Sequence, residues 1–327
     1  MFEWELSTKD PLELLIKIDN ININKYKIYH VHGSMGDVYF QLSSLLIARN
    51  QGMDFVILVD EKYKDWVEEI FDVKILKLYV NSNIINNYLT KINILGRSNV
   101  LPIRLLPTLY PEIAELILNA DLNYINFLAH LIGIKKPIEL ISIEPKDDKN
   151  HIENYFISNN LPIGKTVIIC PDNNTHKEFS NEIWLDIINI INECRLIPCI
   201  NNSGTLNLEN SFLSKIDGVH KIKIKPQNIV TTCEVAGSYI GGTNGFITVQ
   251  SLFNKSSPGI HLINLNEENK FVKDKFNNIL EPQYCKHENL YHDHFKKLQL
   301  EILVENKINK DNYKLIKEFF KIVSDRI

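Results

Sequence analysis

Short runs of β-branched and aromatic residues alternate along this chain with longer segments in which apolar residues recur at helical spacing. The pattern begins near residue 26, where a strand-like run over residues 26–32 precedes a helical pattern over residues 38–50. Two more strand-like runs, residues 54–59 and 73–80, enclose a helical pattern over residues 61–71. Strands that alternate with helices are typical of an α/β fold.

The same alternation restarts in the second half of the chain. Strand-like runs are expected at residues 166–171, 196–200, 238–242 and 259–263, and helices at residues 180–194, from Pro226 onward, and at residues 246–254. Between the halves, residues 96–111 have the prolines of a loop, and residues 111–134 have the spacing of two helices.

Residues 134–148 are expected to be the linker between two domains, because they contain Pro137 and Pro145 and end in a cluster of charges. At about 150 residues per domain, a chain of 327 residues has room for two. We therefore expect an N-terminal domain over residues 1–147 and a C-terminal domain over residues 148–309. An amphipathic helix over residues 310–327 is expected to dock back onto the first domain.

Composition and charge exclude several classes of protein. Hydrophobic residues make up 44% and charged residues 23%, the balance of an ordinary globular protein. The formal net charge of −4 argues against nucleic acid as a partner. Five cysteines without a C-x-x-C pair favour a reducing compartment, so a cytoplasmic location is expected. No secretion signal or membrane span is expected, because the first residues lack a basic segment before an apolar core and no apolar stretch is long enough to cross a bilayer. The sequence has no D-x-D cluster.

The first segment with candidate chemistry is Gly33-Ser34-Met35-Gly36-Asp37, between an expected strand and an expected helix. Glycines allow a ligand to approach the backbone, and a helix N-terminus attracts anions. Asp37 is placed either to cap the helix or to reach into a cleft. The three-glycine fingerprint of a dinucleotide site is absent. His32 would lie near Asp37, where it either lines such a cleft or is an ordinary hydrogen-bonded histidine at the end of the strand.

The second segment is the polar loop over residues 171–180. Asp172 and Asn173 follow a strand directly, and Lys177 supplies a mobile positive charge. Such a loop at the mouth of a sheet suits a phosphorylated ligand, although asparagine-rich loops are also ordinary turns.

The third segment, Gly241 to Thr248, lies at another strand-to-helix junction. Its three glycines, together with Thr243 and Asn244, would form a second helix N-terminus that accepts an anion. Two such junctions in one domain, facing Asp37 in the other, predict a cleft for a ligand that contains a diphosphate.

These segments resemble those of the bacterial heptosyltransferase-like glycosyltransferases, family nine, which have the two-domain GT-B fold. Residues 33–38, G-S-M-G-D-V, match the family's S-M-G-D-V, and residues 177–184, K-E-F-S-N-E-I-W, are similar to K-x-W-P-x-E-x-W. Residues 241–248 are similar to G-x-D-[ST]-G-x-x-H, which places Gly245 on the second glycine. Thr243 and Thr248 depart from the family, which usually has Asp and His there.

The resemblance implies two Rossmann-like domains that face each other across a cleft. It implies that Asp37 is the catalytic base of an inverting, metal-independent sugar transfer. Lys177, Asp172 and Asn173, with residues 243–245 and 248, would hold the phosphates of an ADP-heptose-like donor, and no cofactor is implied. The acceptor would be a hydroxyl of a bacterial surface glycan or of a lipid-linked precursor.

Other functions remain open at this point. The two threonine departures also fit a transferase that uses another activated sugar phosphate, or a GT-B-like sugar-nucleotide epimerase. A non-catalytic GT-B protein that binds a glycan or a partner is the alternative from another class. Peripheral contact with the cytoplasmic face of the inner membrane is also left open. His287, His292, Asp293 and His294 match no closed metal site and indicate a solvated loop.

Overall fold

The computed structural model divides the chain into two compact units, Met1–Ile143 and Glu144–Ile327. The structure describes residues 27–31, 33, 35–71, 75–80, 100–102, 132–134, 141–144, 148–171, 179–202, 216, 219–242, 244–254, 256–264 and 299–325. Both described parts are α/β, which confirms the fold class expected from the alternating pattern.

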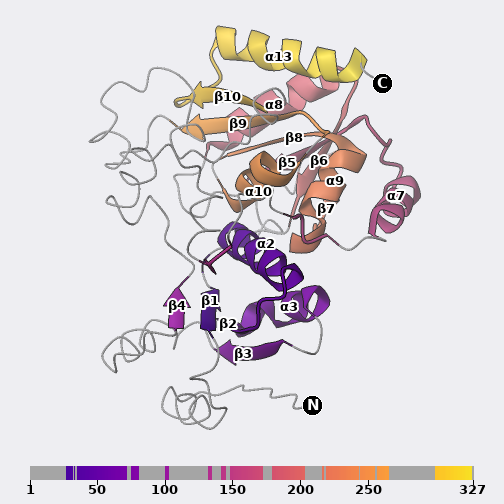
Figure 1. Cartoon of the computed structure of the whole chain (residues 1–327). Helices are drawn as coiled ribbons and strands as arrows, with labels where there is room; N and C mark the ends of the chain where they lie inside the picture. The colour runs from indigo at the N-terminus through magenta and orange to yellow at the C-terminus, as the bar shows by residue number, and fades with distance from the viewer. Residues whose placement is uncertain are drawn as a thin grey trace. The chain divides into compact units, whose positions relative to one another are not determined.

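The first unit is built on a parallel sheet whose strands lie in the order β3-β2-β1-β4 (Figure 1). Its elements are β1 (Lys27–Val31), α2 (Met35–Asn50), β2 (Phe55–Asp60), the 3-10 turn η2 (Glu61–Tyr63), α3 (Lys64–Ile70), β3 (Leu76–Val80) and β4 (Val100–Pro102). The central strands β1 and β2 are almost entirely buried. The helices α2 and α3 share one face of the sheet, where the rings of Tyr39 and Trp66 pack 5.7 Å apart.

The second unit is built on a parallel sheet of six strands in the order β10-β9-β8-β5-β6-β7. Its strands are β5 (Thr166–Cys170), β6 (Ile197–Asn201), β7 (His220–Ile222), β8 (Gly237–Gly242), β9 (Gly259–Asn264) and β10 (Gln299–Val304). Its helices are α7 (Asp148–Ser158), α8 (Asn181–Glu193), the 3-10 turn η5 (Pro226–Asn228), α9 (Ile229–Ala236), α10 (Gly245–Phe253) and α13 (Lys310–Asp325).

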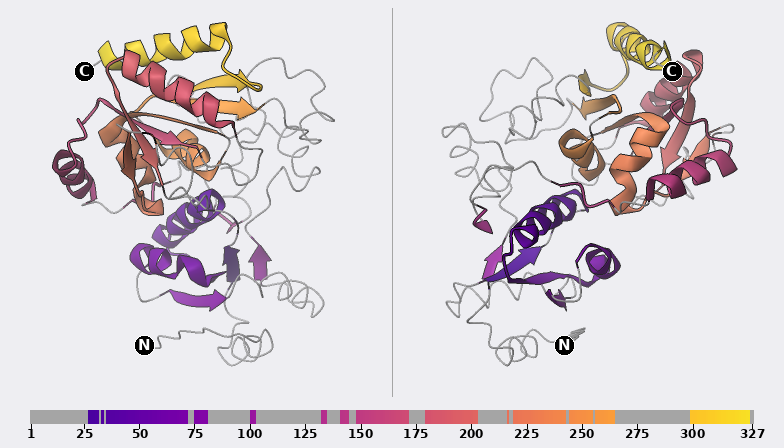
Figure 2. Two further views of the ribbon diagram at one scale, coloured as in Figure 1. Left: turned by 180° about the vertical axis from the view of Figure 1, so that it is seen from behind. Right: turned by 45° about the vertical axis from the view of Figure 1, so that its right-hand side comes forward.

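Helices cover both faces of this second sheet (Figure 2). On one face, α8 and α13 pack over a core that includes Trp184, Ile187 and Phe320. On the other face, α7 and α10 both pack against α9. The parallel crossovers place the N-termini of α9 and α10 at the carboxyl ends of the strands, which is where α/β proteins bind ligands.

The terminal helix does not follow the expectation that it docks onto the first domain. The apolar residues Ile316, Phe320 and Val323 of α13 are buried in the core of the second unit. The Nζ atom of Lys317 pairs with Glu193 of α8 at 2.5 Å. The amphipathic pattern therefore predicted the helix, but not the surface it packs on.

Three short or isolated strands were not expected from the sequence. The segment of β4 was predicted to be loop because of its prolines, yet it pairs with β1 through Pro102 at its end. Neither β7 nor β10 was predicted, and both are edge strands. The two helices expected within residues 111–134 lie outside the described residues. None of the helices in the described part of the chain combines the length and apolar character that crossing a membrane requires.

Candidate functional site

Each sheet has one point at which the direction of strand succession reverses. In the first unit β1 leads outward to β2 and β3, while β4 lies on the other side of β1. In the second unit β5 leads to β6 and β7, while β8, β9 and β10 lie on the other side of β5. Ligands of open α/β sheets bind beyond the carboxyl ends of the strands at such switch points. The three segments with candidate chemistry follow β1, β5 and β8, the strands that border these points.

Asp37 lies in the first turn of α2, directly beyond the carboxyl end of β1, and is half-buried. Gly33 has a φ of +124°, and a β-carbon there would lie 2.6 Å from Oδ2 of Asp37. The turn therefore requires glycine so that the carboxylate can fold back over it. The hydroxyl of Tyr63 donates to the carbonyl of Gly33 at 3.1 Å and so holds this turn from η2. Met35 and Gly36 form the start of the helix, and Ser34 and His32 lie outside the described residues.

The junction between β8 and α10 is closed by a capping asparagine. Oδ1 of Asn244 accepts from the backbone N–H of Ile247 at 3.0 Å, and Gly245 is the first residue of α10. One of the N–H groups of this helix N-terminus is thus already paired within the chain. Gly241 lets β8 lie close to β5 and α10, because a β-carbon there would lie 3.0 Å from the carbonyl oxygen of Cys170.

The described residues cover only part of the expected donor site. Lys177, Asp172, Asn173 and Thr243 lie outside them, and Thr248 is placed in α10 without its side chain. The proposed roles of these five residues therefore remain predictions. The histidine-rich segment near residue 290 also lies outside the described residues.

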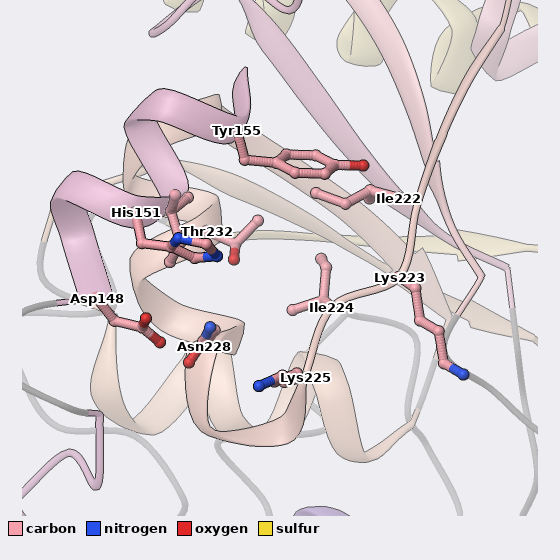
Figure 3. A pocket seen from close by; sticks show the side chains of 10 residues that line it. Asp148, His151, Tyr155, Ile222, Lys223, Ile224, Lys225, Asn228 and Thr232 are labelled. Carbon is pink, nitrogen blue, oxygen red and sulfur yellow. The ribbon is translucent and has the colours of Figure 1, made fainter. Parts of the chain in front are cut away.

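A cavity of about 410 Å³ opens in the second unit, between α7, the segment after β7 and the start of α9. In Figure 3, Asp148 and His151 from α7 lie on one side, and Ile224 and Lys225 on the other. The full lining is Asp148, His151, Ile152, Tyr155, Ile222, Lys223, Ile224, Lys225, Asn228 and Thr232. The lining combines three isoleucines and the ring of Tyr155 with six polar side chains, two of which are lysines. Small-molecule sites likewise combine apolar surface with polar groups that orient the ligand.

Asn201, the last residue of β6, positions the segment that lines this cavity. Its Nδ2 donates to Sγ of Cys170 at 3.3 Å, and its Oδ1 accepts from the N–H of Ile224 at 3.3 Å. The backbone N–H of Asn202 donates to the carbonyl of Ile222 at 2.7 Å. These bonds tie the end of β5, at the switch point, to the cavity wall beyond β7.

Asn228 offers the cavity an acceptor. It is 8% exposed, and no described group donates to its buried Oδ1. A buried acceptor without a donor is costly, so a ligand that donates a hydrogen bond here would be favoured. Sequence reasoning missed Asn228, because the only signal in its neighbourhood, Pro226, marks a helix start.

The cysteines of this region are not suited to nucleophilic chemistry. Burial raises the pKa of Cys199 to about 12 and that of Cys233 well above its usual range, so both thiols stay protonated at neutral pH. Burial also raises the pKa of Tyr155, so its phenol stays protonated in the cavity wall. Within the described part of the chain, no group of three metal-ligating side chains comes together.

No family model matches the sequence, and a search against curated proteins gives no match. Solved structures do match. E. coli ADP-heptose lps heptosyltransferase II aligns with a TM-score of 0.54 at 12% identity, covering 92% of this chain and 99% of that chain. E. coli heptosyltransferase WaaC with ADP aligns with a TM-score of 0.51 at 13% identity, covering 90% and 99%. This chain has the fold of these heptosyltransferases.

The match covers nearly the whole length of both chains and therefore includes both units. WaaC with ADP-2-deoxy-2-fluoro heptose aligns with a TM-score of 0.50 at 13% identity, covering 90% of this chain and 98% of that chain. The GT-B fold expected from three short motifs is thereby confirmed. At such low identity the likeness concerns the fold, and the chemistry has to be argued from the chain's own residues.

Proposed function

We propose that the protein transfers a sugar from a nucleoside diphosphate donor to a hydroxyl group of an acceptor. The observation that carries the proposal is the position of the candidate residues. Asp37 follows β1 and Asn244 with Gly245 follows β8, each at the switch point of its sheet. Solved neighbours with this fold hold ADP and an ADP-linked sugar analogue.

The reaction we infer is an inverting displacement. The acceptor oxygen forms a bond to the anomeric carbon while the bond from that carbon to the diphosphate oxygen breaks. The acceptor proton passes to the carboxylate of Asp37, because a hydroxyl is a weak nucleophile until its proton is accepted. The electron pair leaves with the nucleoside diphosphate. Its growing negative charge would be stabilised by Lys177 and by N–H groups at the start of α10.

The cavity of the second unit supports a place for the base of such a donor. It opens at the carboxyl edge of the same sheet, two strands away from β5, or about 10 Å at the usual spacing of strands. A nucleoside diphosphate spans that distance. The apolar part of the lining, Ile222, Ile224 and the ring of Tyr155, suits a planar base, and Asn228 would accept a hydrogen bond from the edge of that base.

A binding experiment tests the donor class. Thermal unfolding and calorimetry are measured with ADP, UDP, GDP, CMP and simple sugar phosphates, each with and without magnesium. We expect one nucleoside diphosphate to stabilise the protein by about 2.7 kcal/mol at 100 times its Kd, with no dependence on magnesium. The substitution Lys177→Ala should weaken the affinity for this nucleoside diphosphate roughly tenfold. Stabilisation by a sugar phosphate alone would contradict the nucleotide donor and favour the alternative transferase.

A second variant tests the cavity. Asn228→Leu keeps the size of the side chain and removes the acceptor, so nucleotide affinity should fall roughly tenfold. Ile157→Asn, on the outer face of α7, is the control, because Ile157 is 64% exposed and does not line the cavity. Unchanged nucleotide affinity in Asn228→Leu would show that the base does not bind in this cavity.

A further inference from the structure

The chain passes from one unit to the other between Ile143 and Glu144, and a side chain on each side of this point is tied to a helix of its own unit. On the first side, the hydroxyls of Ser142 and Tyr39 of α2 are hydrogen-bonded at 2.8 Å. On the second side, Oε1 of Glu144 accepts from the backbone N–H of Thr231 of α9 at 2.6 Å. The helix α2 carries Asp37, and α9 begins beside the cavity.

The bond between Glu144 and α9 is double. The second carboxylate oxygen accepts from the hydroxyl of Thr231, so one side chain pairs both groups of that residue. Thr231 lies in the first turn of α9, where the backbone N–H groups lack partners within the helix. Thr232, the next residue, lines the cavity, as does Asn228 before the helix. Glu144 thus holds the turn that forms one wall of the cavity.

The surroundings of Glu144 shift the pKa of its carboxyl group. Burial raises the pKa of Glu144 to about 7, and Glu234 on α9 adds to the rise, while the bonds from Thr231 and Val230 oppose it. The other charged groups that the described elements bring to the cavity at this turn are Asp148, His151, Lys223 and Lys225.

We propose that Glu144 is a positioning residue that fixes the first turn of α9, and with it one wall of the cavity, to the point at which the chain enters the second unit. Both the N–H and the hydroxyl of Thr231 donate to the carboxylate of Glu144. Burying the negative charge of this carboxylate costs free energy, and protonation relieves that cost.

The direction of the pH effect follows from the raised pKa of an acid. The stabilisation by the protonated group is complete below its unfolded pKa, near 4.3, and is lost as the pH rises through 7. Between pH 6 and pH 8 this group alone should raise the equilibrium constant for opening of α9 about tenfold.

The test is hydrogen exchange of the amides of α9 at pH 6 and pH 8, corrected for intrinsic rates, in the full-length protein. In the wild type, titration of Glu144 should make opening of α9 about ten times more frequent at pH 8 than at pH 6. Glu144→Gln mimics the protonated side chain, so this part of the pH dependence should vanish while α9 stays protected. Glu144→Ala removes the anchor and should make opening of α9 more frequent at both pH values.

A matched control removes a carboxylate elsewhere. Glu153 of α7 pairs with Lys149 at 3.9 Å on the helix surface, so Glu153→Gln should leave the pH dependence of α9 unchanged. Equal pH dependence in the wild type and Glu144→Gln would overturn the charge effect. Unchanged protection of α9 in Glu144→Ala would show that Glu144 does not hold this helix. If Glu144→Ala fails to fold, the comparison of the wild type with Glu144→Gln tests the role of Glu144 alone.

The consequence for ligand binding rests on the proposed function and is measured separately. Calorimetry with ADP and UDP should give at least a threefold weaker affinity in Glu144→Ala, and an affinity within about twofold of the wild type in Glu144→Gln. If neither nucleotide binds the wild type, the proposed function fails while the exchange result still decides the role of Glu144. If the wild type, Glu144→Ala and Glu144→Gln bind the nucleotide equally well while amide exchange of α9 is altered, Glu144 stabilises the helix but does not contribute to ligand binding.

Discussion

At the scale of single residues, Asp37 illustrates how one position can serve structure and chemistry together. Its place in the first turn of α2 suits a negative charge beside a helix N-terminus, and its contact with Gly33 fixes where the carboxylate lies. The position was predictable from five consecutive residues. Asn228 and Glu144 of the second unit were not predictable, because they come from segments that carry no motif.

A substitution at position 37 separates the two roles. Asp37→Asn keeps the size and polarity of the side chain but cannot accept a proton, so turnover should fall about 100-fold or more. Nucleotide affinity, measured by calorimetry, should stay within about twofold, because the donor is assigned to the other unit. Asp54→Asn, an exposed carboxylate paired with Arg49, is the control. If Asp37→Asn turns over as fast as the wild type, Asp37 only caps helix α2 and is not the catalytic base.

For Asn244, too, a capping role can be separated from a role in ligand binding by substitution. Asn244→Asp keeps an acceptor for the N–H of Ile247, so the free energy of unfolding should change by less than about 0.5 kcal/mol. The added negative charge should nevertheless weaken nucleoside diphosphate binding about tenfold through like-charge repulsion. Asn244→Ala, in contrast, should cost about 1 kcal/mol of stability. Unchanged affinity in Asn244→Asp would mean that no phosphate meets this helix end.

At the scale of elements, the sequence pattern predicted the long buried strands and the amphipathic helices, because their periodicity extends over enough residues to be seen. It failed for β4 and β7, which have three residues each, and for β10, whose partner strand β9 lies far earlier in the chain. The docking surface of α13 also escaped prediction, since an apolar stripe shows that a helix packs without showing against what. The cavity could not be predicted, because it joins three separate segments.

The placement of α13 gives a stability prediction. Phe320 is fully buried in the core of the second unit, whereas Ile322, two residues further on, is 56% exposed. Phe320→Ala should therefore lower the free energy of unfolding by about 3 kcal/mol. Ile322→Ala should change it by less than about 0.5 kcal/mol. Urea unfolding followed by circular dichroism measures both, and equal losses would contradict the packing of α13 on α8.

At the scale of the whole molecule, we propose that the second unit binds the donor and that the first unit supplies the base. Each unit has a parallel sheet, a switch point, and a strand-to-helix turn with candidate residues. The likeness to the fold of the E. coli heptosyltransferases extends over both units. The junction at Ile143 and Glu144 is anchored on each side within its own unit.

The most direct test of nucleotide donor binding is hydrogen exchange of the full chain with and without ADP, UDP and GDP. We predict that one of these nucleotides slows exchange of the amides after β5, after β8 and around Asn228. Amides of β10 and α13, which lie outside the proposed site, should be unaffected. Protection confined to the first unit, or none with any nucleotide, would contradict the assignment of the donor to the second unit.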